Sequence, residues 1–138
     1  MNDRLDIALA ADADGVHLGQ EDLPLRIARQ LAGHRFLIGV SCQTLKQALS
    51  AQAQGADYIG FGSVFPTLTK PERRGMDLAM LTKVVKRIKI PLFPIGGINL
   101  ENLVQLRELN IRRAAVTRSI CLAKNAGTVT KLLRKTLE

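Results

Sequence analysis

The chain has 138 residues, of which 46% are apolar, and it carries a formal net charge of +8. This length predicts one domain over residues 1–138, with enough apolar residues for a hydrophobic core. Aromatic residues make up only 4% of the chain and tryptophan is absent, so the core must consist mainly of Leu, Ile, Val and Ala. The longest apolar runs are shorter than a membrane span and no leader-like segment opens the chain, which indicates a cytoplasmic protein without membrane association.

The positive charge does not favour nucleic-acid binding. Most basic residues fall on predicted helices, and no aromatic residues that could stack on bases are interleaved with them. Such residues are typical of solvated helix faces. The remaining interpretations of the charge are an anionic surface and an anionic small substrate. The basic residues concerned are Lys83, Lys86, Arg87, Lys89, Arg112, Arg113, Lys131, Arg134 and Lys135.

Short apolar strands alternate with amphipathic helices along the chain. Apolar spacing and capping residues such as Thr44, Asn99, Gly33 and Gly55 predict the helix limits. Helices are expected over 5–11, 23–31, 44–54, 77–88, 100–109 and 127–137. Strands are expected over 15–18 and 36–40, from Tyr58 to the break at Pro66, over 91–98 and over 114–117.

Five strands that alternate with helices must run parallel, joined by right-handed crossovers. The interval of about twenty to thirty residues between strands suits either an open doubly wound sheet or part of a (β/α)₈ barrel. The dinucleotide-binding pattern GxGxxG does not close any strand, which disfavours a nucleotide-binding sheet. The pattern alone leaves sheet and barrel open.

The central strand and its loop read YIGFGSVFPTLTKP, residues 58–71. Gly60 and Gly62 permit another group to approach the backbone closely. Thr67, Thr69 and Lys70 then bring two hydroxyls and an ammonium past the carboxyl end of the strand, where α/β proteins bind ligands. These residues predict a cradle for a phosphorylated ligand, and the alternative is an ordinary polar connecting loop.

Four stretches together resemble the thiamine-phosphate synthase (thiamine-phosphate pyrophosphorylase) family. They are NDRLDIALAADADGVHLGQEDLPL at 2–25, GVSCQT at 39–44, GADYIGFGSVFPTLTKP at 55–71 and IPLFPIGGI at 90–98. The resemblance implies an α/β fold of the parallel (β/α)₈ TIM-barrel type, with about five of its eight βα units in this chain. It also implies a transferase that joins an aminopyrimidine carried on a diphosphate to a thiazole carried on a phosphate, giving thiamine phosphate and pyrophosphate.

The resemblance assigns the pyrimidine diphosphate and its metal to one group of residues. Asp3 and Asp22 match magnesium ligands, which suits a hard ion that also bridges diphosphate oxygens. Asn2, Ser41 and Lys70 match positions that contact the diphosphate, with Lys70 and Ser41 as the residues that assist its departure. Without the resemblance, Asp3 would be a helix N-cap, Asp22 a first-turn acid, Ser41 a strand-terminal hydroxyl and Lys70 a surface charge.

A second group matches the thiazole-phosphate site. Gly97 corresponds to a glycine whose N–H meets the phosphate, a contact that a side chain would obstruct. Arg118 stands where the family most often has serine, so it either binds the phosphate bidentately or turns outward. The residues of this group are Thr67, Leu68, Thr69, Gly97, Thr117 and Arg118.

The cysteines and histidines are expected to have structural roles. Cys42 and Cys121 follow no metal spacing and lie in or next to predicted strands, which indicates buried, reduced thiols. His17 is interpreted as a packed barrel histidine and His34 as a surface histidine, both in preference to catalysis. The implied reaction, loss of pyrophosphate to give a carbocation that the thiazole nitrogen captures, needs no nucleophilic side chain.

The resemblance also implies that the first three strands of the family's barrel are missing, together with a Gln-x-Arg-x-Lys segment that clamps the diphosphate. Residues 1–4 match the end of the third strand. We therefore expect this chain to be inactive or nearly so on its own. Three explanations are open: a truncated synthase, a complementing N-terminal fragment supplied by another chain, or a homo-oligomer in which a rearranged sheet pairs through its edges. The alternatives are a related thiazole tautomerase and a non-catalytic, regulatory protein that binds thiazole phosphate. Asp3, Asp22 and Lys70 favour the synthase, since an isomerase has no pyrophosphate to neutralise.

Overall fold

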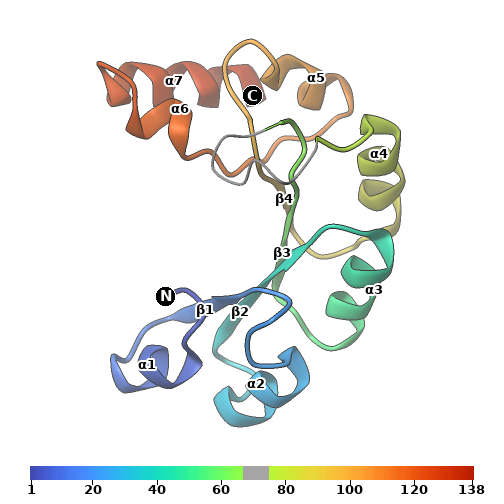
Figure 1. Ribbon diagram of the computed structural model, residues 1–138, viewed down its shortest axis with the longest axis vertical. Helices are drawn as coiled ribbons and strands as arrows, with labels where there is room; N and C mark the ends of the chain where they lie inside the picture. Colours follow the sequence, from blue (N-terminus) through green and yellow to red (C-terminus); the bar gives the residue numbers. More distant parts are fainter. Residues whose placement is uncertain (67–74) are drawn as a thin grey trace. The chain divides into compact units, whose positions relative to one another are not determined.

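A computed structural model describes residues 1–66 and 75–138 and shows the expected alternation of strands and helices (Figure 1). The strands are β1 (Gly15–Leu18), β2 (Leu37–Cys42), β3 (Tyr58–Phe61) and β4 (Leu92–Pro94). The helices are α1 (Leu5–Ala10), α2 (Leu25–Ala32), α3 (Leu45–Ala53), α4 (Leu78–Arg87), α5 (Leu103–Glu108), α6 (Arg118–Cys121) and α7 (Ala126–Leu137). Among these described helices, none is long and apolar enough to cross a membrane.

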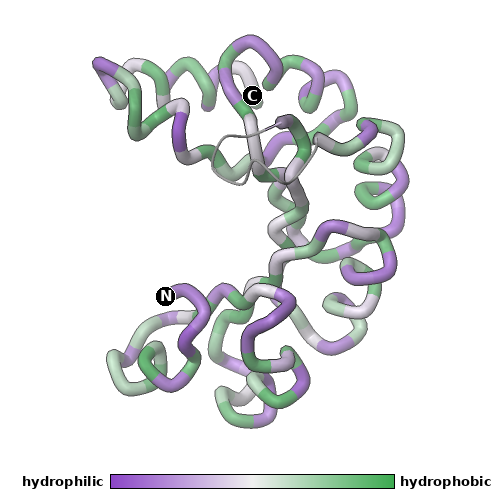
Figure 2. The backbone as a smooth tube through the Cα atoms, viewed as in Figure 1, coloured by the Kyte–Doolittle hydropathy of each residue, from purple (hydrophilic) through white to green (hydrophobic). Residues whose placement is uncertain are grey.

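The described residues form two compact units. The first comprises Met1–Phe61 and Lys83–Leu92, and the second comprises Gly62–Thr82 and Phe93–Glu138. Helices in both units carry hydrophilic and hydrophobic segments side by side (Figure 2). This amphipathic pattern is the one expected of helices that cover a sheet or one another.

The sheet has the strand order β1-β2-β3-β4. β1 pairs with β2 and β2 with β3, both in parallel. The residues before α1 extend the pairing, because Asn2 forms a parallel bridge with His17 and the Asp3 N–H donates to the His17 carbonyl at 2.9 Å. The Ile59 N–H donates to the Pro91 carbonyl at the other side of β3, where β4 begins.

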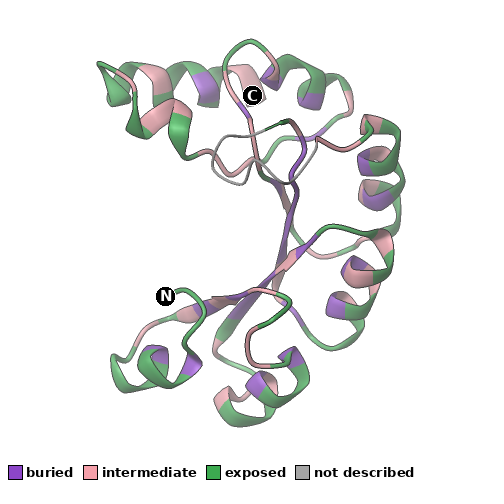
Figure 3. Ribbon diagram, viewed as in Figure 1, coloured by how far each residue is buried: buried purple, intermediate pink, exposed green. Residues whose placement is uncertain are grey.

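In the first unit, one face of the sheet is apolar and buried (Figure 3). Alternate strand residues point to this face, where the buried positions of α1, α2 and α3 also lie. The buried residues are Leu5, Ala8, Val16, Leu18, Leu25, Ala28, Ile38, Val40, Ala48, Ala51, Ile59 and Phe61. The predicted N-cap of α3 is confirmed: Thr44 and Gln47 form a reciprocal capping box.

A guanidinium joins the loops at the amino ends of β2 and β3. Arg29 of α2 donates to the carbonyls of Gly33, Phe36 and Gly55, and it pairs with Asp57 at 2.6 Å. The other partner of the same Asp57 oxygen is the Ile38 N–H of β2, also at 2.6 Å. Because this arginine side chain is only 11% exposed, its hydrogen bonds are weakly screened and fix where the two strands start.

The second unit departs from the sequence predictions in several places. The strand expected over 91–98 ends at Pro94, and the one expected from Tyr58 to Pro66 ends at Phe61, before this unit begins. The expected strand over 114–117 is a single parallel bridge between Ile95 and Ala115. The short helix α6 follows at once and was not predicted. The N-cap of α5 is Asn102 rather than Asn99, because the Asn99 side chain accepts from the N–H groups of Glu101 and Asn102 and so forms a turn before the helix.

The two cysteines have different environments. Cys42 is buried in β2, as expected, and burial raises the pKa of its thiol to about 11. The prediction of a buried thiol is wrong for Cys121, which is exposed. It lies at the end of α6 because the chain turns into this helix two residues after the Ile95–Ala115 bridge, where a longer strand had been expected.

We expect iodoacetamide at pH 8 to alkylate Cys121 and to spare Cys42 in the folded chain. With a pKa of about 11, roughly one Cys42 thiol in a thousand is ionised at this pH, and the thiolate fraction rises only as the pH approaches that pKa. Mass spectrometry should show modification of Cys121 alone in buffer and of both cysteines in denaturant. Cys121→Ser is the control, and rapid labelling of this variant without denaturant would contradict the prediction.

Candidate functional site

The face of β1–β3 opposite the buried one carries a polar cluster, called here the His17 face: His17, Gly39, Ser41, Tyr58 and Gly60. Parallel register places His17 beside Gly39 and Gly39 beside Tyr58, with Ser41 beside Gly60. The His17 ring lies between two hydroxyls: Nε2 is 2.9 Å from Ser41 Oγ, and Nδ1 is 3.1 Å from Tyr58 OH. Three strands thus contribute to one hydrogen-bonded chain.

Two glycines make room for this arrangement. A Cβ on Gly39 would overlap the Tyr58 ring, and a Cβ on Gly60 would lie 3.3 Å from His17 Cε1. The imidazole and phenol rings lie with their centroids 5.5 Å apart. The close approach predicted at Gly60 is therefore confirmed, and the group that approaches it is the His17 imidazole.

Burial lowers the pKa of His17, while the carboxylates of Asp3 and Asp22 act in the opposite direction. Burial also raises the pKa of the Tyr58 phenol. The phenol therefore keeps its proton at neutral pH and can donate it. The direction of the His17 shift therefore follows from burial first, and the negative charge of the two aspartates opposes it.

The two aspartates follow the carboxyl ends of neighbouring extended segments. Asp3 comes after the Asn2–His17 bridge and has a φ of 64°, a conformation that costs energy for any residue except glycine. Asp22 follows β1 and accepts a hydrogen bond from the Gly19 N–H through Oδ2 at 2.6 Å. Neither serves as the helix residue that the sequence alone would suggest, because α1 has Arg4 as its N-cap and α2 begins at Leu25.

Within residues 1–66 and 75–138, no three His, Cys, Asp or Glu side chains are grouped as ligands of a metal ion. Two carboxylates nevertheless fit magnesium, which proteins often hold through one or two carboxylates, with waters and substrate phosphates completing its shell. The Asp3 side chain is exposed. Asp22 accepts the Gly19 N–H through Oδ2, and Oδ1 is its second carboxylate oxygen. By their chemistry, carboxylate oxygens of this kind suit a magnesium ion that also binds phosphate oxygens.

In the second unit, two glycines follow β4. Gly96 has a φ of 101° and Gly97 a φ of 64°, values that favour glycine. A Cβ on Gly96 would overlap Ser63 Oγ, and one on Gly97 would overlap the Pro66 carbonyl oxygen. The Asn102 side chain fixes the Gly97 carbonyl at 2.9 Å. The backbone at Gly96 and Gly97 therefore comes close to Ser63 and Pro66, as the sequence predicts for these glycines.

The remaining predicted phosphate ligands are distributed as follows. Thr117 and Arg118 are exposed at the start of α6, where Thr117 is the N-cap without a side-chain capping bond. The next residue, Ser119, donates its hydroxyl to the Ile98 carbonyl at 2.8 Å and so ties this turn to the segment after Gly97. Thr67, Leu68, Thr69 and Lys70 lie outside the described residues.

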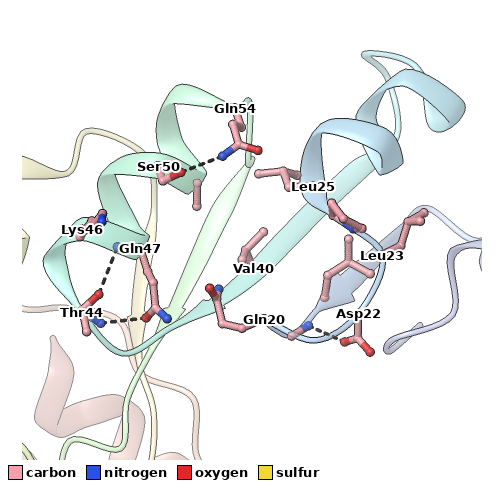
Figure 4. A pocket seen from close by; sticks show the side chains of 14 residues that line it. Gln20, Asp22, Leu23, Leu25, Val40, Thr44, Lys46, Gln47, Ser50 and Gln54 are labelled. Atoms are coloured by element: carbon pink, nitrogen blue, oxygen red, sulfur yellow. Dashed lines mark hydrogen bonds between the residues drawn. The ribbon is translucent and has the colours of Figure 1, made fainter.

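A groove of about 500 Å³ lies between α2 and α3 (Figure 4). Val40 lines the groove, whereas Ser41 does not. Because successive strand residues point to opposite faces, the groove lies on the helix side of β2, away from the His17 face. Asp22 belongs to the rim of this groove, and Gln20 reaches from the same loop to the Ser41 carbonyl at 2.6 Å.

Comparison with solved structures first identifies the fold class of the chain. The chain matches 3-hexulose-6-phosphate synthase with a TM-score of 0.71 at 21% identity, over 97% of this chain and 67% of that one, which supports the fold alone. Its parallel strands and helices are those of an α/β protein of the TIM-barrel type. The match to thiamine phosphate pyrophosphorylase from Pyrococcus furiosus has a TM-score of 0.88 at 42% identity, over 99% of this chain and 65% of that one.

Sequence comparison then gives the family. The family described as "Thiamine monophosphate synthase" matches residues 1–120. The chain is 49% identical over 134 residues to thiamine-phosphate synthase of Prochlorococcus marinus, covering 96% of this chain and 38% of that protein. It is 44% identical over 138 residues to the Pyrococcus furiosus thiamine-phosphate synthase, of which it covers 66%. This chain belongs to the thiamine monophosphate synthase family, and it spans between about a third and two thirds of these relatives' length.

The sequence interpretation missed part of the His17 face. It treated His17 as a packing residue and gave Tyr58 and Gly39 no role. One signal was available, because His17, Ser41 and Tyr58 all belong to strands with glycine at alternate positions, in GVHLG, GVS and YIG. Glycine opposite a ring-bearing residue on a neighbouring strand indicates a ring that lies flat over the sheet.

We expect Gly39→Ala to displace the Tyr58 ring and to destabilise the fold by about 1–3 kcal/mol, the usual cost of overpacking a filled site. Gly127→Ala in α7 is the matched control, because its Cβ would meet Asn125 Oδ1 at an ordinary 3.6 Å and alanine favours helix. Urea unfolding measures both. Equal stability of the two variants would contradict the packing inferred for Tyr58.

Proposed function

We propose that this chain carries the magnesium-diphosphate and thiazole-phosphate binding residues of a thiamine-phosphate synthase. The reaction condenses hydroxymethylpyrimidine diphosphate with thiazole phosphate to give thiamine phosphate and pyrophosphate. The observation that supports it most is the family match over residues 1–120.

In this proposal Asp3 and Asp22 hold magnesium, which when bound would neutralise negative charge on the diphosphate and its leaving group. The Asp3 N–H donates to the His17 carbonyl and so fixes the backbone that carries the first carboxylate. The Gly19 N–H donates to the Asp22 carboxylate itself. Both side chains therefore start from defined backbone positions, which reduces the entropy lost when a ligand binds.

Asn2, Ser41 and Lys70 bind the diphosphate oxygens in the proposed site. The Ser41 hydroxyl can donate to an anionic oxygen, and the Lys70 ammonium can balance the charge that grows as the C–O bond to the diphosphate breaks. The electron-rich pyrimidine carries the resulting positive charge, and the thiazole nitrogen attacks it. No side chain of this chain acts as a nucleophile.

The thiazole phosphate is proposed to meet main-chain N–H groups more than side chains. Gly97 supplies one N–H where a Cβ has no room, and Thr67, Leu68, Thr69 and Thr117 supply others or hydroxyls. Arg118 is exposed, so it is available to bind the phosphate bidentately. The two ligand groups together distinguish a synthase from a thiazole tautomerase or a thiazole-phosphate-binding regulator, neither of which needs the diphosphate group.

Calorimetric titration with pyrophosphate should detect binding that requires magnesium. We expect Asp3→Asn and Asp22→Asn each to weaken this binding at least about tenfold, since a metal ligand of full charge is lost. Asp14→Asn is the control, because Asp14 is exposed and precedes β1 rather than following it. Binding of thiazole phosphate without any binding of magnesium pyrophosphate would favour the tautomerase or the regulator.

We expect a polypeptide of these 138 residues to show no measurable condensation on its own. The four described strands and the Ile95–Ala115 bridge fall short of the eight strands of a closed barrel, which leaves strand edges unpaired and, by the family resemblance, the diphosphate clamp incomplete. Adding a polypeptide with the preceding βα units of a family member, or self-association, should restore product formation, which release of pyrophosphate measures. Turnover by the 138 residues alone at about 1 s⁻¹ or faster, a rate typical of enzymes, would contradict this expectation.

A further inference from the structure

The His17 ring links two hydroxyls that differ in chemistry. Nδ1 is 3.1 Å from the phenolic oxygen of Tyr58, and Nε2 is 2.9 Å from the alcohol oxygen of Ser41. A neutral imidazole has one N–H and one lone pair, so it donates to one hydroxyl and accepts from the other. Two arrangements are possible, and they give the Ser41 hydroxyl opposite roles.

The acidity of the hydroxyls favours one arrangement. A phenol is a stronger hydrogen-bond donor than an alcohol, and its oxygen is a poorer acceptor because a lone pair is delocalised into the ring. The Tyr58 O–H therefore donates to Nδ1, and the Nε2–H donates to Ser41 Oγ. The tautomer of the ring is set by the partner of its other nitrogen. In an imidazolium the Nε2–H points to Ser41 as well, so the role of Ser41 does not depend on the charge of the ring.

The surroundings hold this geometry. A Cβ on Gly39 would overlap the Tyr58 ring and a Cβ on Gly60 would lie 3.3 Å from His17 Cε1, so glycine at both positions leaves room for the two rings. The carbonyl of Ser41 accepts from Gln20 Nε2 at 2.6 Å, which fixes the backbone that carries the hydroxyl. With Oγ accepting from His17, the Ser41 proton is directed to another acceptor.

We propose that His17 is a positioning residue: together with Tyr58 it orients the Ser41 hydroxyl so that its proton is donated to an anionic oxygen of the ligand. This inference rests on the proposed function in one respect: it takes the anionic oxygen of the ligand to be an oxygen of the diphosphate. His17 itself does not touch the ligand. Its effect on binding passes entirely through Ser41.

The direction of the hydrogen bonds can be measured without ligand. The chain contains two histidines, and His34 is exposed, so it serves as the internal reference in ¹⁵N NMR of histidine-labelled protein. His34→Gln assigns the signals. We expect the His17 ring in the Nε2–H form with Nδ1 unprotonated, and a loss of this preference in Tyr58→Phe. A His17 ring in the Nδ1–H form would overturn the proposal.

The functional consequence is measured by titration with magnesium pyrophosphate. Ser41→Ala should weaken binding about tenfold to a hundredfold, the effect of losing one hydrogen bond to a charged oxygen. His17→Phe, which keeps a ring over Gly60, should cause a loss of similar size. In His17→Gln, the side-chain amide N–H takes the place of the Nε2 donor, so this variant should retain most of the affinity.

The double variant His17→Phe/Ser41→Ala separates positioning from a general structural effect. If His17 acts through Ser41, the double variant binds no more weakly than Ser41→Ala alone. Additive losses, or an equal loss in His17→Phe and His17→Gln, would overturn the proposal. Failure of the unaltered chain to bind magnesium pyrophosphate would contradict the proposed function instead, whereas the ring tautomer would still decide the direction of the hydrogen bonds.

Discussion

The parallel register of β1, β2 and β3 is the constraint on which the first unit depends. Strand side chains alternate between faces, so a shift of β2 by one residue would exchange its two sets of neighbours. Ile38 and Val40 would then leave the apolar layer under the helices, and Ser41 would enter it without a partner. Both consequences cost free energy, through lost apolar burial and through a buried unpaired hydroxyl. The register that buries the apolar residues is therefore also the register that brings the residues of the His17 face together.

Two polar networks hold this register. At the amino ends of the strands, Arg29 and Asp57 satisfy backbone groups of β2 and of the loops before it. Across the opposite face of the sheet, His17 joins the hydroxyls of Ser41, near the carboxyl end of β2, and of Tyr58, at the start of β3. Among the described residues, no buried side-chain polar atom is left without a hydrogen-bond partner. Such networks stabilise one arrangement only when every member is paired. In the second network this pairing fixes the Ser41 hydroxyl on the His17 face.

The sequence predicted the parts of the structure that depend on local pattern. The helices and first strands follow from apolar spacing, and the close approaches at Gly60 and Gly97 follow from glycine after or within a strand. The contact between His17 and Tyr58 could not be read locally, because the residues are 41 positions apart and meet only through the register of three strands. The exposure of Cys121 was missed for a similar reason, since pairing stops after Ala115 and the chain turns into α6.

The candidate site needed the resemblance as well as the pattern. Composition and spacing assign Asp3 and Asp22 to helix starts, yet α1 is capped by Arg4 and the Asp22 carboxylate turns back to Gly19. These are positions after strand ends, where backbone groups orient a side chain without burying it. Only the quoted motifs assign these aspartates to a metal.

The two groups of predicted ligands differ in what they say about function. Residues near Gly97 suit any phosphate, because backbone N–H groups bind phosphate oxygens irrespective of what the phosphate is attached to. The proposed diphosphate group is more selective, since it would combine two carboxylates with the Ser41 hydroxyl. Carboxylates repel a bare phosphate and become useful only when a divalent cation lies between them and the anion. A chain that only bound thiazole phosphate would gain nothing from this repulsion, so the charge pattern of the first unit is the feature that favours a synthase.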